Sequence, residues 1–258
     1  MKTKSSVLAS VLAWLAAFLS IAPFVYVLAL SFLPASGGVT FHYYYQVFLG
    51  TSQYLTRFWK SLLICLCVVA GQLVVSILAG YGFAKCQFKG KNALLFLLMI
   101  LMVLPLQVTL APNYIMLDSL GLLDTYAALI LPSIFAPLGT FILTQSFKSV
   151  SEDIVDAAKL DGCGLFRLLV KVVLPMNTSG LVCVTLLSFL DGWNMVEQPI
   201  AYLKDFMRYP ISVALAYVPP ADPTLQLVCC VLVVLPPLFL FTYFNRELVE
   251  GIVLAEMK

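Results

Sequence analysis

Long apolar segments separated by short polar ones dominate the chain. A helix rises about 1.5 Å per residue, so about 20 apolar residues cross the hydrocarbon core of a bilayer. Acidic residues at 191 and 197 interrupt the fifth of six such segments and make it the weakest. The pattern predicts an all-α polytopic membrane protein with six transmembrane helices, at residues 7–33, 61–84, 93–111, 126–147, 178–198 and 224–244.

Prolines fall inside several of these segments, where membrane helices tolerate them at kinks packed by neighbouring helices. They are Pro105, Pro132, Pro137, Pro236 and Pro237. The first segment follows Lys2 and Lys4, as the core of a signal peptide would, and small residues come after it at 35–37. Its apolar run is longer than the about 7–15 residues of a signal core, so we expect a retained span.

Basic residues are distributed unevenly between the polar segments. If the N-terminus lies inside the cell, eleven of the fifteen Lys and Arg residues fall on the inner side. The four on the outer side are Arg57, Lys60, Lys204 and Arg208. This excess predicts that both termini are cytoplasmic.

Composition agrees with a membrane protein and excludes several other classes. Only 11% of residues are charged against 62% hydrophobic, whereas average globular chains have about 25% charged residues. The net charge of +2 gives no basic surface for nucleic acid. With one histidine, His42, and no GxxxxGK[S/T] phosphate loop, the sequence offers neither a histidine metal site nor ATP hydrolysis of that type.

The seven cysteines lack the spacing of a metal site. Two pairs are close in sequence, Cys65 with Cys67 and Cys229 with Cys230, and the others are isolated. We expect them to be small apolar packing residues.

Two connections between the spans are longer than turns. Residues 34–60, on the outer side, are rich in Tyr, Phe and Trp, which favours an interfacial aromatic belt over a ligand cage. Residues 148–175, on the inner side, contain a short amphipathic helix. Ser151 is its predicted N-cap, acids follow in its first turn, and Gly162 is the predicted residue that ends it.

One face of this short helix is expected to carry Ile154, Ala157, Ala158 and Asp161, which follow the i, i+3, i+4, i+7 spacing. The two alanines make part of that face shallow, so another surface can approach closely. A second amphipathic stretch, 165–174, leads to Pro175 and the fifth span. The pattern alone leaves two readings open: an ordinary interfacial helix, or a socket for a soluble partner.

The motif Asp156-Ala157-Ala158-x-x-Asp161-Gly162, with Leu174-Pro175 further on, resembles the EAA loop of binding-protein-dependent ABC importer permeases. The wider context is similar to the carbohydrate branch, of the maltose-permease second-subunit type. Further matches are the segments 79–85 and 88–92, Pro105, residues 111–114 and 120–122, Trp193-Asn194 with Pro199, and the tail around Arg246. Asp156 stands where the family usually has Glu, and Ser151 where it has Pro; we expect docking to survive both changes.

The resemblance implies the type I ABC importer permease fold and a non-catalytic role. Residues 1–60 would form the first helix and outer loop, and 61–258 a five-helix core with a coupling loop at 148–175 and a cytoplasmic tail at 245–258. The implied partners are a homologous permease, two ATPase subunits that dock on the coupling loops, and an extracytoplasmic solute-binding protein. No cofactor is expected in this chain, because ATP and Mg²⁺ would bind to the ATPase. The implied location is the inner membrane of a prokaryote.

Polar side chains inside the spans are candidate solute contacts, because they are costly in lipid. We single out Gln72, Gln107, Trp193 and Asn194 as a candidate substrate pathway. Trp193 could stack on a sugar ring and Asn194 could bond to hydroxyls. The alternative for each is a hydrogen bond or packing contact between helices.

Three kinds of function compete as explanations of this sequence. The first is the permease of an importer for a sugar or related polar solute, working by alternating access. The second is a stand-alone secondary transporter or channel, which would normally show internal symmetry or ion-coupling groups inside the membrane. The third is a membrane enzyme, for which the sequence offers no histidine cluster and no convincing pair of intramembrane acids.

Overall fold

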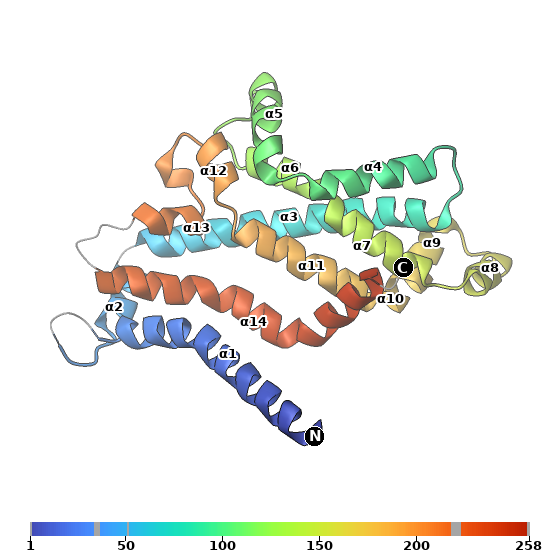
Figure 1. The fold of residues 1–258 in the computed structure, drawn as a ribbon. Coiled ribbons are helices and arrows are strands. Elements are labelled where there is room, and N and C mark those ends of the chain that lie inside the picture. The colour runs from blue at the N-terminus through green and yellow to red at the C-terminus, as the bar shows by residue number, and fades with distance from the viewer. Residues whose placement is uncertain (1, 34–36, 51, 218–222, 257–258) are drawn as a thin grey trace. The chain divides into compact units, whose positions relative to one another are not determined.

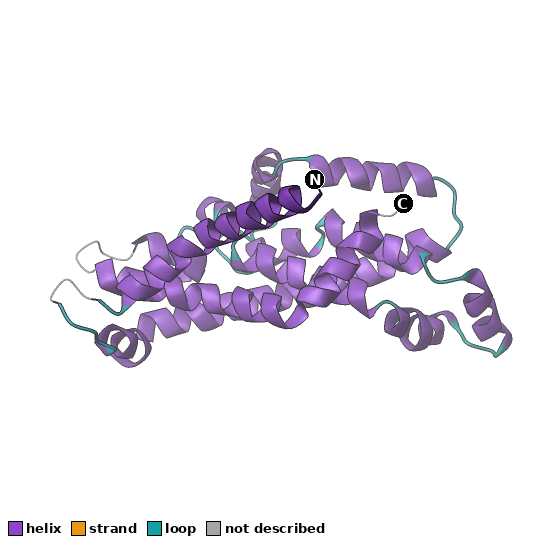
Figure 2. Ribbon diagram, turned by 60° about the horizontal axis from the view of Figure 1, so that its bottom comes forward, coloured by secondary structure: helices purple, strands orange, loops and turns teal. Residues whose placement is uncertain are grey.

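The computed structural model describes residues 2–33, 37–50, 52–217 and 223–256, and all its regular elements in these ranges are helices (Figures 1 and 2). They are α1 Lys2–Ser31, α2 His42–Tyr45, α3 Ser52–Lys85, α4 Lys91–Val103, α5 Leu106–Ser119, α6 Ala127–Ile134, α7 Pro137–Lys148, α8 Glu152–Leu160, α9 Leu165–Leu168, α10 Leu174–Met176, α11 Thr178–Trp193, α12 Glu197–Tyr202, α13 Ile211–Ala214 and α14 Pro223–Glu256. Short π-helical turns at Gln46–Gly50 and Leu169–Val173 and 3₁₀ turns at Phe206–Arg208 and Leu215–Tyr217 complete the set. The prediction of an all-α chain is confirmed.

Four helical segments of the described chain are long and apolar enough to cross a membrane. They are Ser10–Ser31, Tyr54–Lys85, Ala127–Lys148 and Pro223–Glu247. Two further pairs of helices also qualify, each pair bent at a short break, which brings the number to six if each pair is one span. The described residues therefore hold four to six candidate spans, and the predicted six is the upper end of this range.

The third predicted span, 93–111, is not one continuous helix. It divides into α4 and α5, whose axes differ in direction by 105°. Leu104 is extended (φ −66°, ψ 128°) because the ring of Pro105 disfavours helical geometry at the residue before it. The proline expected to bend a span thus breaks it.

The fifth predicted span, 178–198, is shorter than expected. Its helix α11 stops at Trp193, and a separate helix, α12, begins at Glu197. At its other end α11 meets the segment Leu165–Met176 at 84°. Asn177 stabilises that corner: its side-chain amide donates to the Val173 carbonyl at 2.7 Å, and its Oδ1 accepts from the Ser146 hydroxyl at 2.8 Å.

The chain forms two compact units, which we describe separately. One contains residues 1–56 and 215–235 and the other 57–214 and 236–258. In the first, the Ser31 hydroxyl lies 2.7 Å from that of Tyr44, and Phe32 stacks on the Tyr44 ring with centroids 5.0 Å apart. Aromatic residues of the predicted outer belt therefore pack on the end of α1.

The second unit holds two buried apolar clusters. The first joins α3, α7, α8, α11 and the π-helical turn Leu169–Val173 through residues that include Tyr81, Phe147, Val155 and Val173. The second joins α3, α5, α6 and α12 through residues that include Val68, Leu117, Leu129 and Tyr202. All seven cysteines are free thiols in the described chain, and several pack in these apolar surroundings, as expected.

Candidate functional site

Helix α8 carries the sequence motif and begins much as predicted. Ser151 occupies the N-cap position with extended geometry (φ −63°, ψ 145°), and Glu152 and Asp153 fill the first turn. The structure differs from the prediction in the capping hydrogen bond. Within the described residues, the Ser151 side chain makes no hydrogen bond to the start of the helix. The two acids are left to interact with the positive end of the helix dipole.

The end of α8 depends on Gly162, as predicted. Its φ of +76° is in the left-handed region, which glycine adopts without strain. The amide of Gly162 donates to the Lys159 carbonyl at 2.9 Å, and that of Cys163 to the Ala158 carbonyl at 3.0 Å. These two bonds form a Schellman motif, which fixes the direction in which the chain leaves the helix.

One side of α8 is attached to the first apolar cluster, and the other is exposed. Val155 is 2% exposed inside that cluster, and Ala158 packs against it. Asp156, Ala157 and Asp161 are exposed. The predicted face is therefore split: Ala158 helps to anchor the helix, while Ala157 and Asp161 point outward.

The exposed side also carries charge. Lys159 donates to Asp156 Oδ1 at 2.9 Å, and this hydrogen bond raises the pKa of Lys159. Lys159 is thus protonated at any physiological pH. Exposed pairs of this kind stabilise a helix little, so they are available to a partner.

Three exposed apolar side chains around the Gly162 turn were not among the predicted site residues. Leu160 is 89% exposed, Leu165 64% and Phe166 77%. The signal was present: large apolar residues flank two glycines in a loop that should face water. Such residues are typical of a surface that another protein covers.

Leu174 and Pro175 lie at the far end of the loop, in α10. Leu174 is half-buried against the first cluster, whereas Pro175 is exposed. Both precede the corner at Asn177, so their place is where the loop enters α11. This position agrees with the distance in sequence between Gly162 and Leu174-Pro175 in the motif, and that distance sets the length of the loop.

The four predicted substrate-pathway residues lie in different surroundings in this structure. Gln72 is 4% exposed and lies beside Gly139 of α7, where an added Cβ would come within 3.1 Å of the Gln72 amide nitrogen. Trp193 is 1% exposed, stacked on Phe189 with centroids 5.6 Å apart. Asn194 is exposed at the end of α11.

Gln107 makes a contact that the sequence did not suggest. Its amide donates to Glu197 Oε1 at 2.8 Å, joining the start of α5 to the start of α12. A carboxylate near the first turn of α5 is also favoured by that helix's dipole. The arrangement matches the alternative of an interhelical hydrogen bond, and solute contact by these residues stays a prediction.

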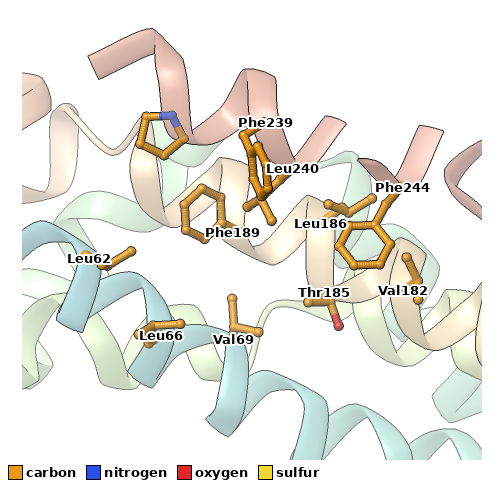
Figure 3. Close-up of a pocket in the computed structure, with 11 residues that line it drawn as sticks. Leu62, Leu66, Val69, Val182, Thr185, Leu186, Phe189, Phe239, Leu240 and Phe244 are labelled. Carbon is orange, nitrogen blue, oxygen red and sulfur yellow. The ribbon is translucent and has the colours of Figure 1, made fainter. Parts of the chain in front are cut away.

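A cavity of about 310 Å³ lies between α3, α11 and the part of α14 after residue 235 (Figure 3). Its lining is apolar except for one hydroxyl, that of Thr185, which already donates to the Leu181 carbonyl. The residues are Leu62, Leu66, Val69, Val182, Thr185, Leu186, Phe189, Pro236, Phe239, Leu240 and Phe244. A hydroxyl-rich solute finds few partners there.

The fold and the family match together define an inner-membrane component of a binding-protein-dependent transport system. Its fold matches a chain of a bacterial ABC transporter involved in the import of the acidic polysaccharide alginate, with a TM-score of 0.82, 18% identity and coverage of 93% of this chain and 95% of that one. Residues 72–250 match the family described as binding-protein-dependent transport system inner membrane component. The chain belongs to this family.

Curated relatives have similar roles in their names. The arabinooligosaccharides transport system permease protein AraQ of Halalkalibacterium halodurans is 28% identical over the whole of both chains. The polygalacturonan/rhamnogalacturonan transport system permease protein YtcP of Bacillus subtilis is 26% identical over 94% of each. The sn-glycerol-3-phosphate transport system permease protein UgpE of Brucella melitensis is 26% identical over 77% of this chain and 72% of its own. The importer-permease prediction is confirmed over a stand-alone transporter or channel.

Proposed function

We propose that the chain is the transmembrane subunit of an ABC importer for a sugar or sugar-derived polar solute, in the inner membrane of a prokaryote. The support for the solute class comes from the relatives, whose names cite arabinooligosaccharides, polygalacturonan or rhamnogalacturonan, and sn-glycerol-3-phosphate. All of these compounds are polar and carry free hydroxyl groups. The chain itself acts without catalysing a reaction.

One observation carries the mechanism: α8 is anchored on one side and exposed on the other. Val155 fixes the helix to the cluster shared by α3, α7 and α11, while Asp156, Ala157, Leu160 and Asp161 are exposed. A partner that holds the exposed side can move the helix, and the buried side passes the motion to the bundle. This is what a coupling helix requires.

The energy comes from the partner. Two ATPase subunits, which bind ATP and Mg²⁺, would dock on α8 of this chain and on its counterpart in a homologous permease. A solute-binding protein outside the membrane would deliver the solute. Alternating access follows if the ATP-bound and nucleotide-free ATPase hold α8 in different positions, because a state can be favoured only by contacts that differ between states.

The test changes the coupling helix without touching the spans. Gly162→Val places a β-branched residue at φ +76°, which costs about 1–2 kcal/mol, whereas Gly162→Asn is tolerated better in that region. Asp156→Trp adds bulk to the exposed side. In vesicles containing the complete transporter, we expect Gly162→Val and Asp156→Trp to insert normally but to lose ATP-dependent uptake, and Gly162→Asn to retain most of it.

Uptake is measured with three labelled solutes: arabinotriose, a galacturonate oligomer and sn-glycerol 3-phosphate. Import of at least one, dependent on ATP and on the binding protein, is the expected result. Uptake that persists in vesicles from which every ATPase has been removed would contradict the proposal.

A further inference from the structure

Lys85, the last residue of α3, contacts the start of the coupling helix. Its ammonium group donates to Glu152 Oε1 at 2.7 Å and to the Val150 carbonyl at 2.6 Å. Glu152 is the first residue of α8, and Val150 lies in the short link that joins α7 to α8. A single side chain therefore joins α3 to the point where α7 becomes α8.

This contact differs from an ordinary surface ion pair in its burial. The Lys85 side chain is 4% exposed, although its partner Glu152 is 67% exposed. An ammonium group withdrawn from water is tolerated only when acceptors surround it, so both bonds hold Lys85 in one position. Exposed pairs, by contrast, contribute little and are easily rearranged.

An apolar contact runs beside the charged one. Tyr81 lies one helical turn before Lys85 on α3, and it belongs to the same buried cluster as Val155 of α8. Lys91, the first residue of α4, donates to the Cys86 carbonyl at 3.0 Å, just beyond the end of α3. Two lysines therefore bond near this end of α3, and Lys85 is the one that contacts the start of α8.

We propose that Lys85 is a positioning residue that transmits the displacement of α8 to α3. The proposal rests on the proposed function, because it needs a partner that moves α8. Without Lys85, α8 would remain attached to α7 through the chain and to the apolar cluster through Val155. It would lose the directional bonds to α3, so movement of α8 would be passed to α3 less completely.

The experiment measures how much solute is imported for each ATP hydrolysed. The complete transporter is reconstituted in proteoliposomes with whichever of the three labelled solutes the wild type imports. The variants are Lys85→Met, which keeps most of the length but removes the charge, Lys85→Arg, which keeps the charge, and Glu152→Ala, which removes the exposed partner. Lys89→Met, at an exposed lysine four residues on, is the matched control.

We expect Lys85→Met to assemble and to hydrolyse ATP while its import per ATP falls about 3- to 30-fold, the range that changes in coupling networks commonly produce. Lys85→Arg should restore part of the ratio, Glu152→Ala should lower it, and Lys89→Met should leave it unchanged. A merely structural role would lower the amount of active complex and leave the ratio intact.

The outcomes separate this inference from the function on which it rests. An active wild type whose ratio is unchanged within about twofold in Lys85→Met and Glu152→Ala would overturn the role of Lys85 alone. If Lys85→Met fails to accumulate, Glu152→Ala decides, because the Glu152 side chain is 67% exposed and belongs to neither buried cluster. A wild type that imports none of the solutes with ATP would overturn the proposed function.

Discussion

At the scale of single residues, Asp124 holds together two loops on the predicted outer side. Its carboxylate accepts the backbone amides of Lys204 and Asp205 at 3.0 and 3.1 Å and pairs with Arg208 at 3.2 Å. Its φ of +59° is in the left-handed region, which Asp tolerates better than most residues. One partly exposed acid therefore sets the geometry of both loops.

These contacts predict a local pH dependence. The amide of Asp205, then that of Lys204, together with Arg208, lower the pKa of Asp124 below its ordinary 3.8. A carboxyl whose pKa is lower when folded stabilises the fold above its unfolded pKa and loses this effect as the pH falls through the folded value. We expect the amides of Lys204 and Asp205 to be protected from hydrogen exchange, corrected for intrinsic rates, until the pH drops below about 3.8.

Asp124→Asn is the variant for this prediction, with Asp118→Asn as its control on the exposed surface of α5. The first should remove the pH-dependent part of the protection and the second should keep it. Equal pH profiles in wild type and Asp124→Asn would show that the carboxylate charge does not hold the loops.

At the scale of elements, the anchoring of α8 depends on Val155. Val155→Ala removes two buried methyl groups, at a cost of about 1–3 kcal/mol by comparison with other large-to-small core changes. Because this side chain attaches α8 to the cluster, we expect faster hydrogen exchange in α8 but not in α11. Ile154→Ala, on a side chain that is 38% exposed, is the control and should leave the exchange of α8 unchanged.

Close helix packing depends on glycines at particular positions. A Cβ on Gly180 of α11 would lie 2.6 Å from the Ser146 hydroxyl oxygen of α7, the group that bonds to Asn177. Gly180→Ala should destabilise the protein by about 1–3 kcal/mol, seen as a lower melting temperature in detergent. Gly82→Ala, where nothing lies within 4 Å of the new atom, should be neutral or stabilising. Equal melting temperatures for the two variants would contradict this packing argument.

The elements differ in how well the sequence predicts them. Helices α3 and α14 and the pair α6–α7 follow from apolar length alone, and Gly162 marks the end of α8 because only a left-handed residue fits there. The breaks at Leu104 and after Trp193 were not predicted. Proline and acidic residues only weaken a helical pattern, and whether a helix bends or stops depends on the neighbours that receive its free backbone groups.

The candidate site was predictable to a similar degree. The motif located α8, but its 3.6-residue period could not tell which side is anchored; that was decided by Val155, outside the predicted face. Lys85 was one more basic residue on the predicted inner side and the last residue of the matched segment 79–85, but neither signal indicated a contact with α8. Its partners are 65 and 67 positions away in sequence, so the contact is visible only in the folded structure.

At the scale of the whole molecule, the orientation of the chain in the membrane is a prediction that still needs a test. The excess of Lys and Arg in the segments assigned to the inner side places both ends, and α8 with them, in the cytoplasm. A fluorescent protein fused after Lys258 should fold and fluoresce, whereas alkaline phosphatase at the same position should be inactive. The reverse result would put α8 outside the cell, where no ATPase could reach it.

The break at Leu104 has a consequence for how this protein can deform. Half of the third crossing, α4, packs on α7, while α5 is fixed to α12 through Gln107 and through the Tyr202 hydroxyl at the Leu110 carbonyl. A stretch of backbone around one extended residue lies between these two packed groups, and it cannot carry torque as an unbroken helix would. A rotation of α4 together with α7 therefore need not be passed on to α5 and α12.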